Sequence, residues 1–312
     1  MVLSIKKFLY RIFVKTRNFW LFAVTLSHRE VRKKIKNAKT VFTPAAGQVF
    51  VAGSFRVSNQ QRQEIFKVSM HETLRRIAGT PIKVKIRDAS SKEFYLGNYA
   101  YLKELVGQNL DYGAESLNLN AAYKELLESS DEKYFCMAFD DQPIFGLTPE
   151  FLSAATALLE DFAGLVNVVP IEQINKFNID NSSKQIILKP NTLDFQMNGI
   201  KPLGTVRYGN YSFVILNNFH YGFFFNTLIA PSKDYAARLN WYMNSVSQDK
   251  PHRIEKAAMY YRGPVYKYIA VPLEVFMLNI DFLHTEISVR GTSGEEKQLF
   301  EALNSGYQLT SI

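Results

Sequence analysis

From residue 48 onward the chain alternates short apolar runs with helical patterns, and this alternation limits the possible folds more than any other feature. Three apolar runs predict strands: "QVFVAGSF" (48–55), "PIKVKIRDASS" (81–91) and "YFCMAF" (134–139). Three segments with helical periodicity and matching start and stop residues predict helices: 59–79, 116–130 and 148–164. Because strands that alternate with helices form parallel sheets, we expect an α/β fold with a mainly parallel mixed sheet, doubly wound and flanked by helices.

Carboxylates follow two of the predicted strands. Asp88 ends the strand within 81–91, and Asp140 with Asp141 follows the strand at 134–139. Parallel strands present their carboxyl ends at one sheet edge, so we expect these three side chains in one crevice. Adjacent carboxylates repel one another unless a cation lies near them. The pattern therefore favours a cation at this edge, although each aspartate alone also fits a turn or a helix cap.

The kind of cation follows from what the chain lacks. The sequence contains no glycine-rich dinucleotide fingerprint and no P-loop, so the usual backbone cradles for phosphate are absent. A divalent cation held by carboxylates can bridge diphosphate oxygens instead. The sequence therefore predicts a metal-assisted phosphate site.

The positive charge of the chain is confined to its first forty residues. The whole chain has a formal net charge of +8, and residues 1–40 contain eleven Lys and Arg against one acid, which gives +10. The remaining residues therefore sum to 8 − 10 = −2. Because a nucleic-acid-binding fold carries its basic footprint across the domain surface, we expect no nucleic-acid partner.

Residues 1–40 alternate aromatic and aliphatic side chains with cations. Their longest uncharged stretch, 18–28, is much shorter than the roughly 18–20 residues of a spanning helix, and no signal-peptide cleavage pattern follows it. Two interpretations stay open: a basic amphipathic helix on an anionic membrane surface, or a helix pair that packs on the domain or on a second subunit. With one cysteine, Cys136, inside an apolar run, the first interpretation predicts a cytoplasmic protein peripheral to the inner face of the membrane.

Short motifs across residues 48–290 resemble the inverting glycosyltransferases of family 2, which have the GT-A fold. The motifs are "SFR", "SMHETL", "IRDASS", "FDDQ" and "SKDYAARLNWYM". The resemblance implies transfer of a sugar from a nucleoside-diphosphate-sugar donor to a glycan or lipid-linked acceptor, with a divalent metal (Mn²⁺ or Mg²⁺) as cofactor. It divides the chain into a basic helical segment at 1–40 and a GT-A-like domain at 41–312. Within that domain, 48–165 is implied to bind the donor and 166–312 the acceptor.

The resemblance also implies roles for single residues. The implied nucleotide-sugar contacts are Ser54, Arg56, Asp88 and Asp140. The implied metal ligands are Asp141 and His284, although a structural histidine fits position 284 equally well. The implied general base is Asp234, whose position before "YAARLNWYM" also suits a helix cap.

Two positions depart from the family pattern. Gln142 stands where many members have aspartate, and Lys233 stands where they have glutamate. A non-catalytic nucleotide- or sugar-binding protein, or a membrane-associated assembly protein on the same fold, therefore stays open as the alternative. A nucleotidyltransferase is a third hypothesis, which the single glycine of "AGSFRVSNQ" disfavours.

Overall fold

The fold is described from a computed structural model of the 312-residue chain. It describes residues 28–38, 47–114, 119–163, 165–169, 171–172, 177–188, 202–217, 228–245, 268–278, 280–283 and 293–311.

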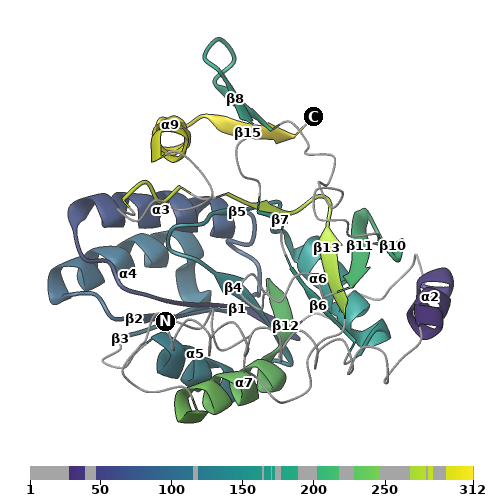
Figure 1. The fold of residues 1–312 in the computed structure, drawn as a ribbon. Helices are drawn as coiled ribbons and strands as arrows, with labels where there is room; N and C mark the ends of the chain where they lie inside the picture. The colour runs from purple at the N-terminus through teal and green to yellow at the C-terminus, as the bar shows by residue number, and fades with distance from the viewer. Residues whose placement is uncertain are drawn as a thin grey trace, which may run out of the picture.

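A nine-stranded sheet forms the centre of the molecule (Figure 1). Its strands are, in spatial order, β10 (Gly204–Tyr208), β11 (Tyr211–Asn217), β13 (Tyr268–Pro272), β6 (Val166–Val168), β12 (Ile229–Pro231), β4 (Tyr134–Ala138), β1 (Val49–Phe55), β2 (Val84–Asp88) and β3 (Leu110–Ala114). Of these nine, β11 and β12 run opposite to the other strands. The expected α/β fold with a mainly parallel mixed sheet is confirmed.

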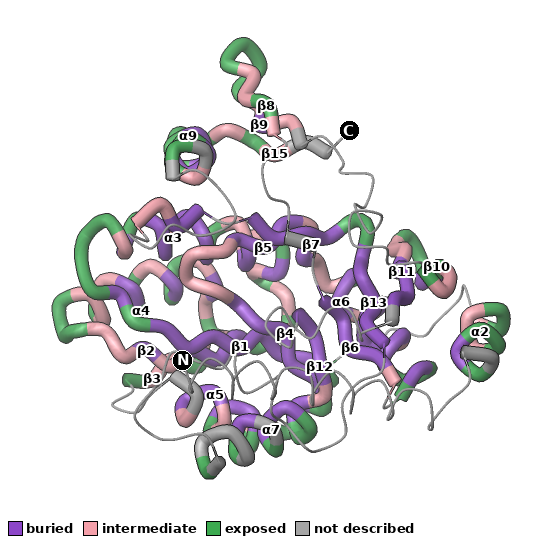
Figure 2. Tube along the Cα trace, in the orientation of Figure 1, coloured by how far each residue is buried: buried purple, intermediate pink, exposed green. Residues whose placement is uncertain are grey.

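Helices cover both faces of this sheet (Figure 1). One face packs against α3 (Gln60–Leu74), α4 (Lys92–Val106) and α6 (Pro149–Asp161). The other face packs against α5 (Leu119–Glu128) and α7 (Ser232–Ser245). Every residue of β1 and of β4 is buried (Figure 2), as expected for strands that are covered on both sides.

The segment between β2 and α5 was not predicted from the sequence. It contains α4, the short 3₁₀ helix η1 (Gly107–Asn109) and the edge strand β3. Helix α4 buries only a narrow stripe, Asn98, Leu102 and Val106, whereas its apolar residues Leu96 and Tyr99 are exposed. Because the apolar residues of α4 do not coincide with its buried face, the periodicity of the sequence does not predict this helix.

Two small sheets lie beside the main one. The first contains β5 (Ile144–Phe145), β14 (Phe276–Met277) and β7 (Ile171–Glu172). The second contains β15 (Gln308–Ser311), β9 (Gln185–Leu188) and β8 (Phe177–Asp180), and it lies next to α9 (Ser293–Asn304). Leu299 and Phe300 of α9 pack in one cluster with Ile65 of α3, which joins this C-terminal layer to the helix that reaches the candidate site.

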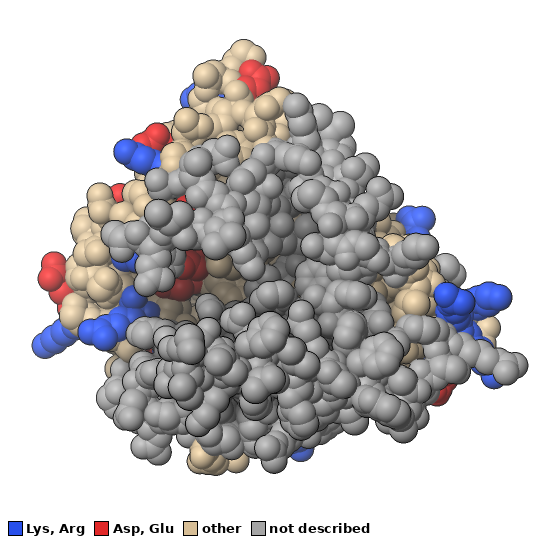
Figure 3. Space-filling model, viewed as in Figure 1, with Lys and Arg blue, Asp and Glu red and all other residues tan. Residues whose placement is uncertain are grey.

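Helix α2 (His28–Asn37) packs on the domain beside β10 (Figure 1). Its Val31 is fully buried, and the Nζ of Lys34 donates a hydrogen bond of 2.7 Å to the carbonyl of Asp161. Basic side chains gather on this side of the molecule (Figure 3). For residues 28–37 the structure supports the interpretation of a helix packed on the domain, while residues 1–27 lie outside the described part. None of the described helices combines the length and apolar character needed to cross a bilayer.

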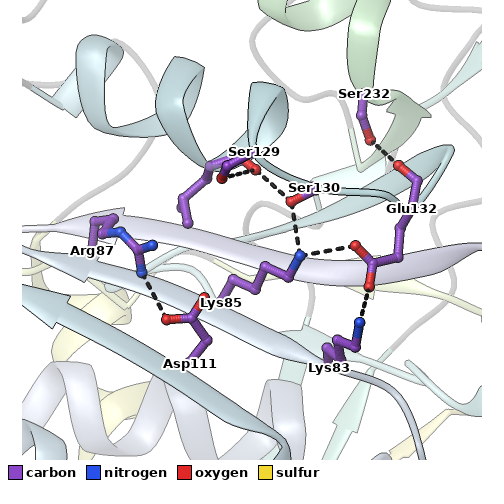
Figure 4. Close-up of polar contacts among 9 residues, drawn as sticks. Lys83, Lys85, Arg87, Asp111, Ser129, Ser130, Glu132 and Ser232 are labelled. Carbon is purple, nitrogen blue, oxygen red and sulfur yellow. Dashed lines mark hydrogen bonds and ion pairs between the residues drawn. The ribbon is translucent and has the colours of Figure 1, made fainter.

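At the entrance of β4, the carboxylate of Glu132 is enclosed by two lysines (Figure 4). Lys83 Nζ and Lys85 Nζ each lie 2.8 Å from one of its oxygens, and Lys85 also donates to Ser130 Oγ at 2.9 Å. Burial alone raises the pKa of Glu132, but the hydrogen bonds from the two lysines outweigh burial and lower the pKa to about 2. This network ties β2, β4 and the start of α7 together, because Ser232 Oγ donates to the carbonyl of Glu132.

Replacing Glu132 by glutamine should lower stability in a pH-dependent way. The folded pKa lies below the unfolded value of about 4.3, so the stabilisation is complete above that value and disappears as the pH falls towards about 2. We expect Glu132→Gln to lose about 3 kcal/mol of unfolding free energy at pH 7, because two lysines lose their anion. Urea unfolding at pH 7, 4 and 2.5 measures the change.

The matched control is Glu160→Gln, because Glu160 pairs at 2.6 Å with Lys133 on the surface. It should cost no more than about 1 kcal/mol at any pH. A difference between Glu132→Gln and the wild type that stays constant down to pH 2.5 would contradict the assignment of the pH dependence to this carboxylate.

Candidate functional site

The carboxyl ends of β1, β2 and β4 meet at one edge of the sheet. β1 pairs in parallel with both neighbours, with Phe55 opposite Asp88 and Gly53 opposite Ala138. Asp88 therefore ends β2 next to β1, and Asp140 with Asp141 leaves β4 at the same edge. The structure brings the three predicted carboxylates to one sheet edge.

Helix α3 fixes the turn that carries the two adjacent aspartates. Ser69 Oγ donates 2.7 Å to the carbonyl of Phe139, and the amide of Ile144 donates 3.0 Å to Thr73 Oγ1. Both hydroxyl side chains are fully buried, so neither bond competes with water. The turn is therefore held at its two ends by one helix.

A segment from the far end of the chain crosses this turn. Strand β14 runs antiparallel to β5, and the amide of Ile280 donates 3.2 Å to the carbonyl of Asp141. Gly146 permits the close crossing: it has φ +81°, and a Cβ there would lie 2.4 Å from the carbonyl oxygen of Glu274. The crossing brings a fourth carboxylate, Asp281, to the site.

Arg62 lies between the carboxylates of two loops. Its guanidinium is 2.9 Å from Asp281 Oδ2 and 3.7 Å from Asp141 Oδ2. The Asp281 side chain is 1% exposed, whereas Arg62 and Asp141 are 21% and 20% exposed. Arg62 and Asp141 thus form the solvent-facing part of this group, with Asp281 beneath them.

Burial and neighbouring negative charges destabilise the charged forms of the adjacent aspartates. Burial is the main cause in both, and it raises the pKa of Asp140 to about 6, with a further rise from the charges of Asp281 and Asp88 and an opposing effect of Arg62. The pKa of Asp141 is raised well above its ordinary value by burial, then by Asp140 and Asp281, again against Arg62. The single guanidinium of Arg62 therefore does not compensate the negative charges of the carboxylates at this edge.

Asp88 already accepts three hydrogen bonds from the protein. Its carboxylate accepts from the amide of Ser90 at 2.7 Å, from Asn98 Nδ2 at 3.0 Å and from the hydroxyl of Tyr112. Asn98 accepts in turn from Gln63 Nε2 at 3.1 Å. This buried chain of contacts joins α3, α4, β2 and β3, so Asp88 holds the elements around the site in place.

The other predicted donor contacts differ in exposure. Ser54 is buried at the end of β1, and its hydroxyl has no hydrogen-bond partner among the residues that the structure describes. Arg56 follows β1 and is exposed. Both lie at the sheet edge of the carboxylates, whereas the predicted metal ligand His284 falls outside the described residues.

The structure does not bring Asp234 to this edge. Strand β12 runs antiparallel to β4, with Pro231 opposite Tyr134, and the amide of Ser232 donates 2.9 Å to the carbonyl of Lys133. Asp234 lies in the first turn of α7, just beyond that point and at the entrance of β4, while Asp140 follows the exit of β4. The intervening length of extended chain separates them by on the order of 20 Å. The structure therefore does not bring Asp234 together with the three carboxylates, and its role as general base stays a prediction from the family resemblance.

Sequence reasoning missed Arg62 and Asp281. Each carried a signal that could have identified it. Asp281 follows the apolar run "FMLNI", as Asp140 follows "YFCMAF". Arg62 is a cation in the first turn of a helix, where acids are favoured, and that first turn contains no acid.

The residues at this edge suit a divalent cation that is shared with a phosphate ligand. Carboxylate oxygens are what Mg²⁺ and Mn²⁺ prefer, and Mg²⁺ is commonly held by one or two carboxylates plus substrate phosphates. Within the described parts of the chain, no group of three or more His, Cys, Asp or Glu is arranged as a complete metal site. Asp140 and Asp141 therefore fit a cation that completes its coordination with ligand oxygens and water.

Comparisons with known proteins give structural neighbours only. No protein-family model matches the chain, and no curated protein matches it either. Among solved structures, residues 1–349 of S. aureus TarS align with 11% identity and a TM-score of 0.42, over 82% of this chain and 70% of TarS 1–349. GalNAc-T7 with UDP, GalNAc and Mn²⁺ aligns with 12% identity and a TM-score of 0.43, over 74% and 43% of the two chains.

A third neighbour is the mannosyltransferase PcManGT from Pyrobaculum calidifontis, in complex with GDP-Man and Mn²⁺. It aligns with 13% identity and a TM-score of 0.32, over 53% of this chain and 47% of the other. The chain thus spans less than half of the PcManGT and GalNAc-T7 chains. At these identities and TM-scores the likeness to the three structures concerns the fold alone and assigns no activity to this chain.

Removing the Asp88 carboxylate should destabilise the fold. Asp88→Ala leaves the buried amide of Asn98 and the hydroxyl of Tyr112 without their acceptor. We expect a loss of roughly 3–5 kcal/mol in unfolding free energy, because hydrogen bonds to a charged group and the burial of unpaired donors both contribute. Urea unfolding at pH 7 measures this loss.

Asp111→Ala, on the neighbouring strand, is the matched control. Asp111 is exposed and pairs with Arg87 at 3.2 Å, so its removal should cost at most about 1 kcal/mol. Equal effects of the two substitutions would show that Asp88 has no structural role.

Proposed function

We propose that the protein is a glycosyltransferase that takes a sugar from a nucleoside-diphosphate-sugar, with its donor site at the carboxyl edge of β1, β2 and β4. The observation that carries the proposal is the convergence of Asp140, Asp141, Asp281 and Arg62 at this edge. Incompletely neutralised carboxylates favour a divalent cation, and the cation with Arg62 offers two positive groups to a diphosphate. Ligands of open α/β sheets bind at this edge.

The proposed reaction assigns separate tasks to the residues at this edge. The bond between the sugar C1 and the diphosphate oxygen breaks, a bond from C1 to an acceptor hydroxyl oxygen forms, and the hydroxyl proton passes to a base. A divalent cation at Asp140 and Asp141 would supply charge stabilisation for the leaving diphosphate. Asp88 positions β2 and α4 around the nucleotide, and the buried hydroxyl of Ser54, which has no hydrogen-bond partner among the described residues, lies at the same edge.

The acceptor side of the proposal rests on the sequence and on α2. We propose a glycan or lipid-linked acceptor, as the family resemblance implies. Arg32, Lys33 and Lys36 of α2 are exposed while Val31 is buried in the domain, so the helix presents cations to solvent. These cations support contact with an anionic membrane surface, where a lipid-linked acceptor would be located.

A second candidate is a non-catalytic nucleotide-binding protein on the same fold. One observation favours it: the residue predicted as general base lies at the opposite edge of the sheet. This candidate predicts donor binding without release of a nucleoside diphosphate.

Donor binding tests the proposal. UDP- and GDP-sugars are titrated into the full chain by calorimetry with Mn²⁺, and release of nucleoside diphosphate is followed with water as the acceptor. Asp140→Asn should weaken binding of the preferred donor at least about tenfold, which is about 1.4 kcal/mol, because it removes a cation ligand. Asp234→Asn should leave donor affinity and release within about twofold, since Asp234 is at the other edge.

Three outcomes separate the hypotheses. Binding with release supports the glycosyltransferase, and binding without release supports the non-catalytic protein. If the wild type binds neither class of donor with or without Mn²⁺, both are wrong. Loss of release in Asp234→Asn would support Asp234 as the general base despite its place at the other edge of the sheet.

A further inference from the structure

Arg62 is in an electrostatically unfavourable place for its own helix. It is in the first turn of α3, where the helix dipole disfavours a cation, and its backbone amide is capped by Asn59 at 2.9 Å. Its guanidinium is held there by carboxylates from two other segments, Asp141 and Asp281. The position is therefore determined by the carboxylates and not by the helix.

The two ion pairs of Arg62 differ in strength. The 2.9 Å contact with buried Asp281 has hydrogen-bond length, and the amide of Leu283 occupies the other oxygen of that carboxylate at 3.1 Å. The 3.7 Å contact with Asp141 is longer than a hydrogen bond and is partly exposed to solvent. Asp281 thus anchors the guanidinium, whereas its contact with Asp141 is the one that can be exchanged.

A donor diphosphate offers Arg62 a better partner than Asp141 does. Guanidinium and phosphate form two parallel charge-assisted hydrogen bonds, which are stronger than a loose pair with one carboxylate oxygen. When the guanidinium turns towards phosphate, Asp141 loses the positive charge that opposed its repulsion from Asp140. The affinity of Asp141 for a divalent cation is then higher than in the free protein.

We propose that Arg62 couples the two ligands of the proposed donor site: it competes with a divalent cation for Asp141 in the free protein, and it moves to the diphosphate when the donor binds. This inference rests on the proposed function and identifies a donor-binding and positioning residue for it. By linkage, a nucleoside diphosphate raises the affinity for the cation, and the cation raises the affinity for the nucleotide by the same factor.

Cation binding without any sugar tests the coupling. Mn²⁺ is titrated into the full chain, alone and with saturating UDP or GDP, and free Mn²⁺ is measured by electron paramagnetic resonance. In the wild type, the nucleotide should tighten Mn²⁺ binding about tenfold. In Arg62→Gln, Mn²⁺ alone should bind about tenfold more tightly than to the wild type, and the nucleotide should tighten Mn²⁺ binding by a smaller factor than in the wild type, because only the shared diphosphate oxygens still couple the two ligands.

Two further variants complete the experiment. Arg76→Gln, at an exposed arginine beyond the end of α3, is the matched control and should behave as the wild type. Arg62→Lys keeps the charge but loses the fork of donors, so it should keep the weak affinity for Mn²⁺ alone while the coupling to nucleotide falls. This variant tests the proposal even where Arg62→Gln does not fold, which circular dichroism determines.

The failures of the inference and of the proposed function are distinguishable. If nucleotide binds but Arg62→Gln leaves the Mn²⁺ affinity and its coupling unchanged, the role of Arg62 is wrong and the donor site stands. If Arg62→Gln weakens Mn²⁺ binding, Arg62 supports the cation and does not compete with it, which also overturns the inference. If neither UDP nor GDP binds with or without Mn²⁺, the proposed function fails and the coupling fails with it.

Discussion

The parallel register of β1 with β2 and β4 is the constraint on which the site depends. These three strands run the same way, and β1 and β4 are buried on both faces, so charged residues follow β1 and β4 only beyond the strand ends. Those ends coincide at one edge, so Asp88 and Asp140 come together although they are far apart in sequence. A reversal of either pairing would send their carboxylates to opposite edges.

The site is held by polar contacts that link the helix layer to the strand ends. Ser69 and Thr73 of α3 fix the turn after β4, and Asn98 of α4 binds the carboxylate that ends β2. Buried polar side chains are costly unless they are paired, so each contact is satisfied only in one arrangement of helix against sheet. The same contacts that specify the packing therefore also set the positions of the carboxylates.

The sequence predicts local patterns and their order better than it predicts long-range contacts. Alternating apolar runs were sufficient for the fold class and for the edge that carries Asp88, Asp140 and Asp141. The position of Asp234 was not predictable, because the direction of β12 depends on pairing with β4 and not on its own three residues. Arg62 and Asp281 were missed for a related reason: their partners are in segments that meet only through the crossing of β5 by β14.

The buried carboxylates at the two edges of the sheet are paired with cationic side chains to different extents, and this difference favours one edge as the place of ligand binding. At the entrance of β4, one carboxylate, that of Glu132, has two lysines at 2.8 Å and a lowered pKa. At the exit, Arg62 lies 3.7 Å from Asp141 and is also paired with Asp281, and the pKa values of Asp140 and Asp141 are raised. Folding stability alone favours the first arrangement, in which every charge is paired inside the protein. The second arrangement costs free energy in the absence of a ligand, and a cation or a diphosphate with its cation would recover it. The unbalanced edge is therefore the one at which ligand binding is expected.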